Sequence, residues 1–188
     1  MKQKISYLFF LAILLTGNAY AQKEKPNFSG TWNLDKKESK TYFLGSENSE
    51  FTRQLPDCSV EKTIEHNEPE LKIRTITKCL EETSMGKSLK TFETNFIYFT
   101  DGRGEVNKPD DSDSIESKTK WDGNKILIVN NHINPKNNKK EMSLSKELSI
   151  SKNKAEMFEK LADNKSGFYS AATAFGSIYT KRVYKLSK

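Results

Sequence analysis

The chain has 188 residues, with 31 Lys and Arg against 25 Asp and Glu, so its formal net charge is +6. This length suits one ordinary domain with its own hydrophobic core and excludes a multi-domain machine. Two Cys and two His in all argue against a structural zinc site, and 11% aromatic residues with only 9 Gly exclude a collagen, a coiled coil or a fully disordered chain.

The first 21 residues are typical of an export signal. Two early lysines give a basic start, residues 7–15 are a short apolar core, and residues 19–21 (AYA) form a small-x-small cleavage site. The core is too short to span a bilayer, which takes about 20 residues, although an uncleaved anchor is the alternative. We therefore predict a signal peptide at 1–21, a single domain at 22–188 with net charge +4, and a secreted or periplasmic location.

Two alternating runs on either side of a polar turn predict a β-hairpin. The runs span 58–66 and 70–79 around a loop at 67–70, and the register that pairs their apolar residues also places Cys58 opposite Cys79 on one face. Cβ atoms opposed in this way lie about 4.5–5.5 Å apart, close enough for a bridge. We predict a structural disulfide between them, with two buried thiols as the alternative.

Period-2 alternation recurs along the rest of the chain, and short strands joined by tight turns indicate an antiparallel sandwich or barrel. The predicted strands are 28–35, 58–66, 70–79, 88–99, 113–122, 124–133, 141–151, 155–162 and 176–187. Residues 36–57 are predicted as a long loop or a short helix, and 163–176 as a connection rich in apolar residues. Residues 153–163 also match a helical stripe, and we favour a strand because it completes a hairpin.

Three stretches carry a resemblance to a known family: the Gly-x-Trp at 30–32 on the first strand, Trp-Asp-Gly at 121–123, and a basic residue on the last strand, Arg182. With these the chain resembles the lipocalin-like (calycin) superfamily, and in particular small secreted bacterial lipocalin-like domain proteins. The resemblance implies an all-β, antiparallel up-and-down β-barrel of about 8–10 strands. It also implies a structural clamp in which Gly30 allows close approach and Arg182 covers the indole of Trp32.

Physical chemistry supports the clamp independently, because a guanidinium is attracted to an indole face and a contact between first and last strands removes exposed sheet edges. The alternative is a plain core residue at Trp32 and a surface charge at Arg182.

Aromatic and aliphatic side chains share faces of the predicted strands, as the walls of an apolar cavity do. The candidate ligand-binding residues are Phe92, Phe96, Tyr98, Trp121, Leu144 and Leu148. The same faces could fill a closed core. We predict a non-catalytic binding protein for a small, largely apolar ligand held inside the barrel. The alternative is a closed-barrel protein-interaction module, an inhibitor or an envelope-associated protein, that uses 36–57 and 163–176.

Other classes of function have little support in the sequence. There is no Gly-x-Ser-x-Gly elbow, the two histidines are isolated, and the acidic run at 110–113 lacks the spacing of a calcium loop. The positive charge comes mostly from Lys that alternates with apolar residues, whereas nucleic-acid binding favours clustered Arg with aromatics. We therefore predict no catalytic activity, cofactor, metal, nucleic-acid partner or membrane span, and the oligomeric state stays open.

Overall fold

The computed structural model describes residues 24–43, 58–83, 86–109, 114–134, 136–163 and 178–187. Within these ranges the chain forms ten strands and no helix. The strands are β1 Gly30–Phe43, β2 Cys58–Asn67, β3 Glu70–Thr83, β4 Gly86–Phe99, β5 Glu105–Asn107, β6 Ser114–Asp122, β7 Lys125–Ile133, β8 Lys140–Ile150, β9 Glu156–Asp163 and β10 Ile178–Leu186. The predicted all-β class is confirmed, and so is a strand rather than a helix at 153–163.

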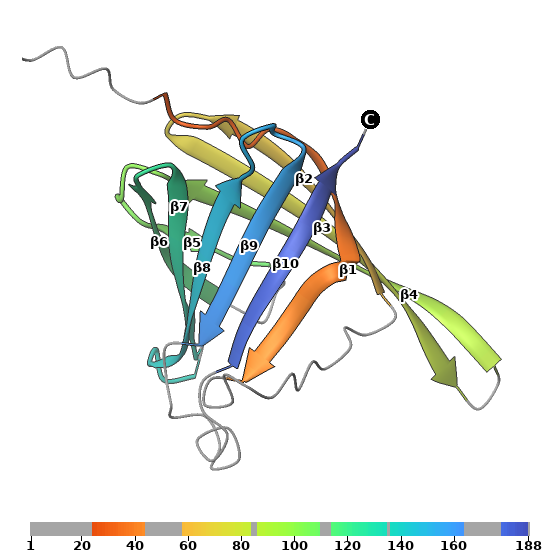
Figure 1. Cartoon of the computed structure of the whole chain (residues 1–188). Coiled ribbons are helices and arrows are strands. Elements are labelled where there is room, and N and C mark those ends of the chain that lie inside the picture. Colours follow the sequence, from red (N-terminus) through yellow and green to blue (C-terminus); the bar gives the residue numbers. More distant parts are fainter. Residues whose placement is uncertain are drawn as a thin grey trace, which may run out of the picture.

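The strands form a single antiparallel sheet in the order β4-β3-β2-β1-β10-β9-β8-β7-β6-β5. Strands that follow each other along the chain pair with each other, except β4 and β5, which are the two edges of the sheet, and β1 pairs with β10. The sheet curls into a nearly closed up-and-down barrel, from which the far ends of β3 and β4 project as a hairpin (Figure 1). This is the barrel that the sequence predicted.

Side chains of the short strand β5 bridge the gap between the two end strands of the sheet. Asn107 accepts the backbone N–H of Ile97 at 2.8 Å and donates its amide to the carbonyl of the same residue at 2.9 Å. Glu105 accepts the N–H of Phe99 at 3.2 Å. The barrel wall is therefore continued across β4 and β5 by side chains, which imitate the bonds of a backbone ladder. The sequence analysis did not predict β5.

The first strand continues into the segment predicted as a loop or short helix at 36–57, so that prediction is wrong as far as Phe43. The register with β10 shifts after Asp35, which marks a bulge. Within the bulge, Ser39 donates its hydroxyl to the carbonyl of Asp35 at 2.6 Å and accepts the N–H of Val183 at 3.0 Å. Its side chain thereby supplies the hydrogen bonds that the broken ladder lacks, and a polar sequence remains a strand.

The β2–β3 hairpin has the predicted register. Cys58 pairs with Cys79 across the ladder, and the two form a disulfide with their Cα atoms 4.1 Å apart. The turn is tighter than the predicted loop at 67–70, because Asn67 and Glu70 already pair and only two residues separate them. A disulfide is typical of proteins from oxidising compartments.

One end of the barrel is plugged by the segment before β1. Phe28 is fully buried there, and its carbonyl accepts the indole N–H of Trp32 at 3.0 Å. Gly30 has φ of +144°, a conformation that residues with a Cβ rarely adopt, so the backbone favours glycine at this position. The core behind the plug consists of Ile64, Leu71, Ile73, Tyr98, Ile126, Ile128, Leu148, Met157 and Tyr184. The predicted signal peptide at 1–21 lies outside the described residues.

Candidate functional site

Four charged residues occupy inward positions on four different strands: Lys62 on β2, Lys146 on β8, Glu159 on β9 and Arg182 on β10. Each alternates along its strand with residues of the opposite face, so the pleat directs its side chain into the barrel. The side chains of Lys62 and Glu159 are 5% and 1% exposed. Charged residues are almost never buried so fully without a partner, and this cluster is therefore the main candidate site.

The cluster is built around a single carboxylate. Oε1 of Glu159 lies 2.9 Å from Lys62 Nζ and 3.6 Å from Lys146 Nζ. Oε2 lies 3.6 Å from Arg182 Nη1 and accepts the hydroxyl of Tyr184 at 2.9 Å. Three cations thus surround one anion, which leaves two positive charges uncompensated among the described side chains of the cluster.

Burial and charge act in opposite directions on the titration of the cluster. Burial, together with the neighbouring cations, lowers the pKa of Lys62 to about 8 against the attraction of Glu159. Burial alone would raise the pKa of Glu159, but the three cations outweigh it and hold the pKa well below its usual range. Burial also raises the pKa of the Tyr184 hydroxyl. At neutral pH the cluster is therefore an ionised carboxylate with an excess of positive charge.

Four of the six predicted ligand-binding residues gather around the same cluster. Lys146 Nζ lies 5.9 Å from the ring centroids of both Phe96 and Tyr98, which stack on each other at 5.7 Å. Because β8 and β4 are far apart in the sheet, this contact crosses the barrel interior. Leu144 and Leu148 flank Lys146 on the inward face of β8. Aromatic and aliphatic walls therefore adjoin the surplus charge.

Two buried polar atoms in the interior, Ser117 Oγ on β6 and Arg182 Nε on β10, have no hydrogen-bond partner among the described residues. Tyr98 on β4 and Asn130 on β7 add a buried hydroxyl and a buried amide to the same interior, where their side chains interact with each other. An unpaired buried polar atom costs about 1–3 kcal/mol. A bound molecule with polar groups would satisfy the two unpaired atoms.

The other two predicted ligand-binding residues lie elsewhere. Trp121 belongs to the plugged end, where its indole N–H donates to Glu68 at 2.7 Å and its ring lies 6.1 Å from that of Phe28. His66 fills the same end and accepts the N–H of Phe28 at 3.3 Å. Phe92 is 45% exposed on the projecting hairpin.

The residues of the predicted clamp have different neighbours from those expected. Trp32 is 2% exposed and donates to a backbone carbonyl, while the guanidinium of Arg182 lies beside Glu159 in the interior. No cation–π contact joins Arg182 to Trp32 within the described part of the chain. Lys62, Lys146 and Glu159 are not among the predicted site residues, and the only signal for them in the sequence is that each is a charge in the inward phase of an alternating run.

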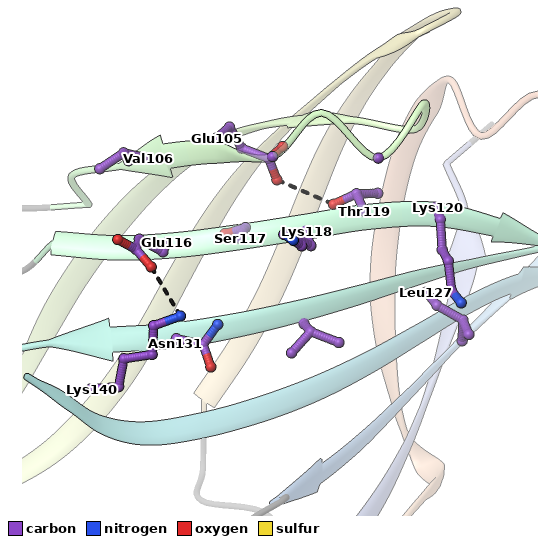
Figure 2. Close-up of a pocket in the computed structure, with 13 residues that line it drawn as sticks. Glu105, Val106, Glu116, Ser117, Lys118, Thr119, Lys120, Leu127, Asn131 and Lys140 are labelled. Atoms are coloured by element: carbon purple, nitrogen blue, oxygen red, sulfur yellow. Dashed lines mark hydrogen bonds and ion pairs between the residues drawn. The ribbon is translucent and has the colours of Figure 1, made fainter.

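A concave groove lies on the outer face of β5–β8 (Figure 2) and has a volume of about 810 Å³. Val106, Leu127 and Val129 give it an apolar floor. The rest of its lining is mainly backbone and charged side chains, from Gly102, Gly104, Glu105, Glu116, Ser117, Lys118, Thr119, Lys120, Asn131 and Lys140. None of the predicted ligand-binding residues lines this groove.

The described residues contain no metal-binding cluster and no membrane-spanning helix. No group of three or more His, Cys, Asp or Glu side chains lies close enough to hold a metal ion within them. No helix in the described part of the chain is long and apolar enough to cross a membrane.

Fold and site together define a nearly closed antiparallel β-barrel with a positively charged interior. No family model and no curated protein matches the chain. Among solved structures, it is similar to secretory abundant heat soluble protein 4 from Ramazzottius varieornatus, with a TM-score of 0.48 and 12% sequence identity over 85% of this chain and 94% of that chain.

Proposed function

We propose that the protein is a non-catalytic binding protein that holds a small amphiphilic molecule inside its barrel. The observation that carries the proposal is the ratio of three cations to one carboxylate at Glu159. An anionic group of the ligand, a carboxylate, sulfonate or phosphate, would take up the surplus charge of Lys146 and Arg182. Such charge-assisted hydrogen bonds are about twice as strong as neutral ones.

The apolar part of the ligand would lie against the neighbouring wall of Phe96, Tyr98, Leu144 and Leu148. Burial of apolar surface contributes about 25 cal/mol per Å², so this wall would supply much of the affinity. The unpaired polar atoms Ser117 Oγ and Arg182 Nε would orient the molecule.

The same proposal places the protein outside the cytoplasm, secreted or periplasmic, and within the lipocalin-like superfamily. The disulfide and the export-type sequence at 1–21 support the location. The Gly-x-Trp at 30–32 on the first strand and the up-and-down strand order support membership of this superfamily.

The experiment compares two fluorescent probes that differ in charge, 1-anilinonaphthalene-8-sulfonate and the neutral N-phenyl-1-naphthylamine. Lys146→Met keeps the length of the side chain and removes its charge. We expect it to weaken binding of the sulfonate about 10–100-fold and to leave binding of the neutral probe nearly unchanged. Lys118→Met, on the outer face, is the matched control and should alter neither affinity.

Equal losses for both probes would contradict an anion site at Lys146, because the charge would then have no specific role. If neither probe binds the wild-type protein, the barrel is a closed scaffold and the proposal fails. An interaction module would then be favoured. Of the two segments predicted for such a module, 36–57 and 163–176, residues 44–57 and 164–176 lie outside the described residues.

A further inference from the structure

The projecting hairpin is a two-stranded ribbon, which we call the β3–β4 arm and define as residues 80–83 and 86–95. On one side, β2 begins at Cys58, opposite Cys79, so within the described residues the arm has no β2 partner. On the other side, the side chains of β5 reach only Ile97 and Phe99. The arm therefore leaves the barrel wall with both edges uncovered by any described strand (Figure 1).

The outer edge of β4 presents a regular row of backbone groups. The N–H groups of Ile97 and Phe99 point away from β3, because they donate to side chains of β5. In an antiparallel ladder this direction repeats at every second residue. The amides of Glu93, Thr91 and Leu89 therefore point outward as well, and no described residue pairs with them. This edge is a template for another strand.

The arm also exposes apolar side chains on both of its faces. Leu80 and Leu89 lie opposite each other in the ladder and are 52% and 63% exposed. Phe92 is 45% exposed on the other face. An isolated two-stranded hairpin is marginally stable in water. A third and fourth strand would supply hydrogen bonds and apolar contacts that no described residue gives the arm.

We propose that the β4 edge of the arm pairs antiparallel with the same edge of a second copy of the chain, so that two arms form one four-stranded sheet across a twofold axis. Twofold dimers are the commonest assemblies of identical chains. This inference does not depend on the proposed ligand.

When the axis passes through Thr91, no like charges oppose each other, and Glu93 of each copy lies diagonally from Lys87 of the other on the same face of the sheet. Lys90 then faces Phe92 of the second copy, and Lys87 faces Asn95 of the second copy. The first of these pairs repeats a contact already made within the chain, where Lys90 Nζ lies 5.1 Å from the Phe92 ring centroid. An axis through Lys90 or Glu93 would instead oppose identical charges.

A membrane is a weaker candidate for the partner. Glu81 and Glu82 balance Lys87 and Lys90 on the arm, and Arg74 pairs with Glu93, whereas attraction to an anionic lipid surface takes a cluster of basic residues. The same balance lets two arms approach without net repulsion.

The test is sedimentation velocity of the chain without residues 1–21 over a range of concentrations. Thr91→Pro removes only an outward N–H, so the β3–β4 ladder keeps its bonds. By symmetry the dimer loses two hydrogen bonds, and we expect its Kd to rise at least about tenfold. Thr91→Val keeps the N–H and should dimerise like the wild type. A wild-type protein that stays monomeric at every concentration, or a Thr91→Pro variant that dimerises equally well, would overturn the proposal.

A cross-linking variant keeps the test decisive if the proline variant does not fold. In the proposed register the two copies of residue 91 face each other at about 5.5 Å between Cα atoms, within reach of a disulfide. Thr91→Cys should therefore form a covalent dimer under mild oxidation. Ser88→Cys, three residues from the axis, should not. Equal cross-linking of the two variants would show random collision and contradict the register.

Discussion

The barrel interior and the β3–β4 arm share strand β4 and the same alternation of side chains, yet their residues have opposite environments. Phe96 and Tyr98 stack inside the barrel, whereas Phe92, on the same face a few residues earlier, is 45% exposed. The difference lies in the opposite wall, because the inward face is buried only where other strands lie across from it. Alternation alone therefore defines a face, and topology decides whether the face becomes core.

Charges differ between the two regions in the same way. Glu159 is buried among three cations, and Glu93 on the arm makes an exposed bidentate pair with Arg74, at 2.8 and 2.9 Å. The hydrogen bonds from Arg74 lower the pKa of Glu93 to about 2. Both carboxyl groups thus have a lowered pKa, but water screens the exposed pair. The two shifts carry different consequences for stability.

The largest expected effect tests this contrast directly. Glu159→Gln removes the one anion of the interior cluster and leaves three cations buried around a neutral amide. We expect a loss of about 3–5 kcal/mol in the free energy of unfolding, measured by urea denaturation. The isosteric control on the arm, Glu93→Gln, should change stability little. Similar losses for the two variants would show that burial does not separate the regions.

Truncation of the aromatic residues of β4 should give the next largest effect. Phe96→Ala opens a hole beside Tyr98 and Lys146, and we expect it to cost about 2–3 kcal/mol. Phe92→Ala removes a half-exposed ring and should cost less than about 1 kcal/mol. Both are measured by denaturant unfolding in dilute protein, where association of the arms does not contribute. A larger loss for Phe92→Ala would mean that the arm packs against part of the chain.

Removal of the side-chain bridge across the barrel gap should have a smaller effect. Asn107→Ala leaves the N–H and the carbonyl of Ile97 without their partner, and we expect a loss of about 2 kcal/mol. Hydrogen exchange at the Ile97 amide should also become faster. Val106→Ala, at a neighbouring position that is 62% exposed, is the control. Unchanged exchange at Ile97 would show that the bridge does not hold the gap closed.

The smallest expected effect is a dependence of ligand affinity on pH. An anion bound in the cluster favours the protonated form of Lys62, whose pKa in the free protein is about 8. Affinity for the sulfonate probe should therefore fall as the pH rises above 8, by about tenfold for each pKa unit by which the probe raises the pKa of Lys62. The neutral probe should show no such fall, and Lys62→Met should abolish it. A fall of the same size in that variant would assign the titration to another group.

The β2–β3 hairpin shows how much of the fold local sequence determines. Two alternating runs and a short turn are enough to set its register, and the disulfide between Cys58 and Cys79 follows from that register. The same kind of information, repeated along the chain, predicts an antiparallel sandwich or barrel and leaves the choice between them open. Local alternation failed at the bulge in β1, where the phase shifts and the hydrogen bonds of Ser39 replace the ladder.

The interior cluster shows what local sequence does not reveal. Lys62, Lys146 and Arg182 lie on three strands and converge on Glu159 only when the barrel closes. A single lysine in an alternating run usually faces solvent. Its side chain is buried only where another wall of the barrel lies opposite it. The short strand β5 escaped prediction for a related reason, since its function depends on the strand it bridges rather than on its own pattern.

The order of the strands has one more consequence, for a circular permutant. From one edge to the other, the sheet runs from β5 to β10 and then from β1 to β4. It therefore follows the order of the chain, except that β10 and β1 are neighbours in its middle. The N–H of Ser187 already bonds the carbonyl of Thr31 at 2.8 Å. A short linker between these regions, with new termini at 102–104, would give a chain in which every ladder joins consecutive strands. Such a chain has a lower contact order and should fold faster than the natural one. Its two ends would lie at the gap between β4 and β5, which the side chains of Glu105 and Asn107 bridge.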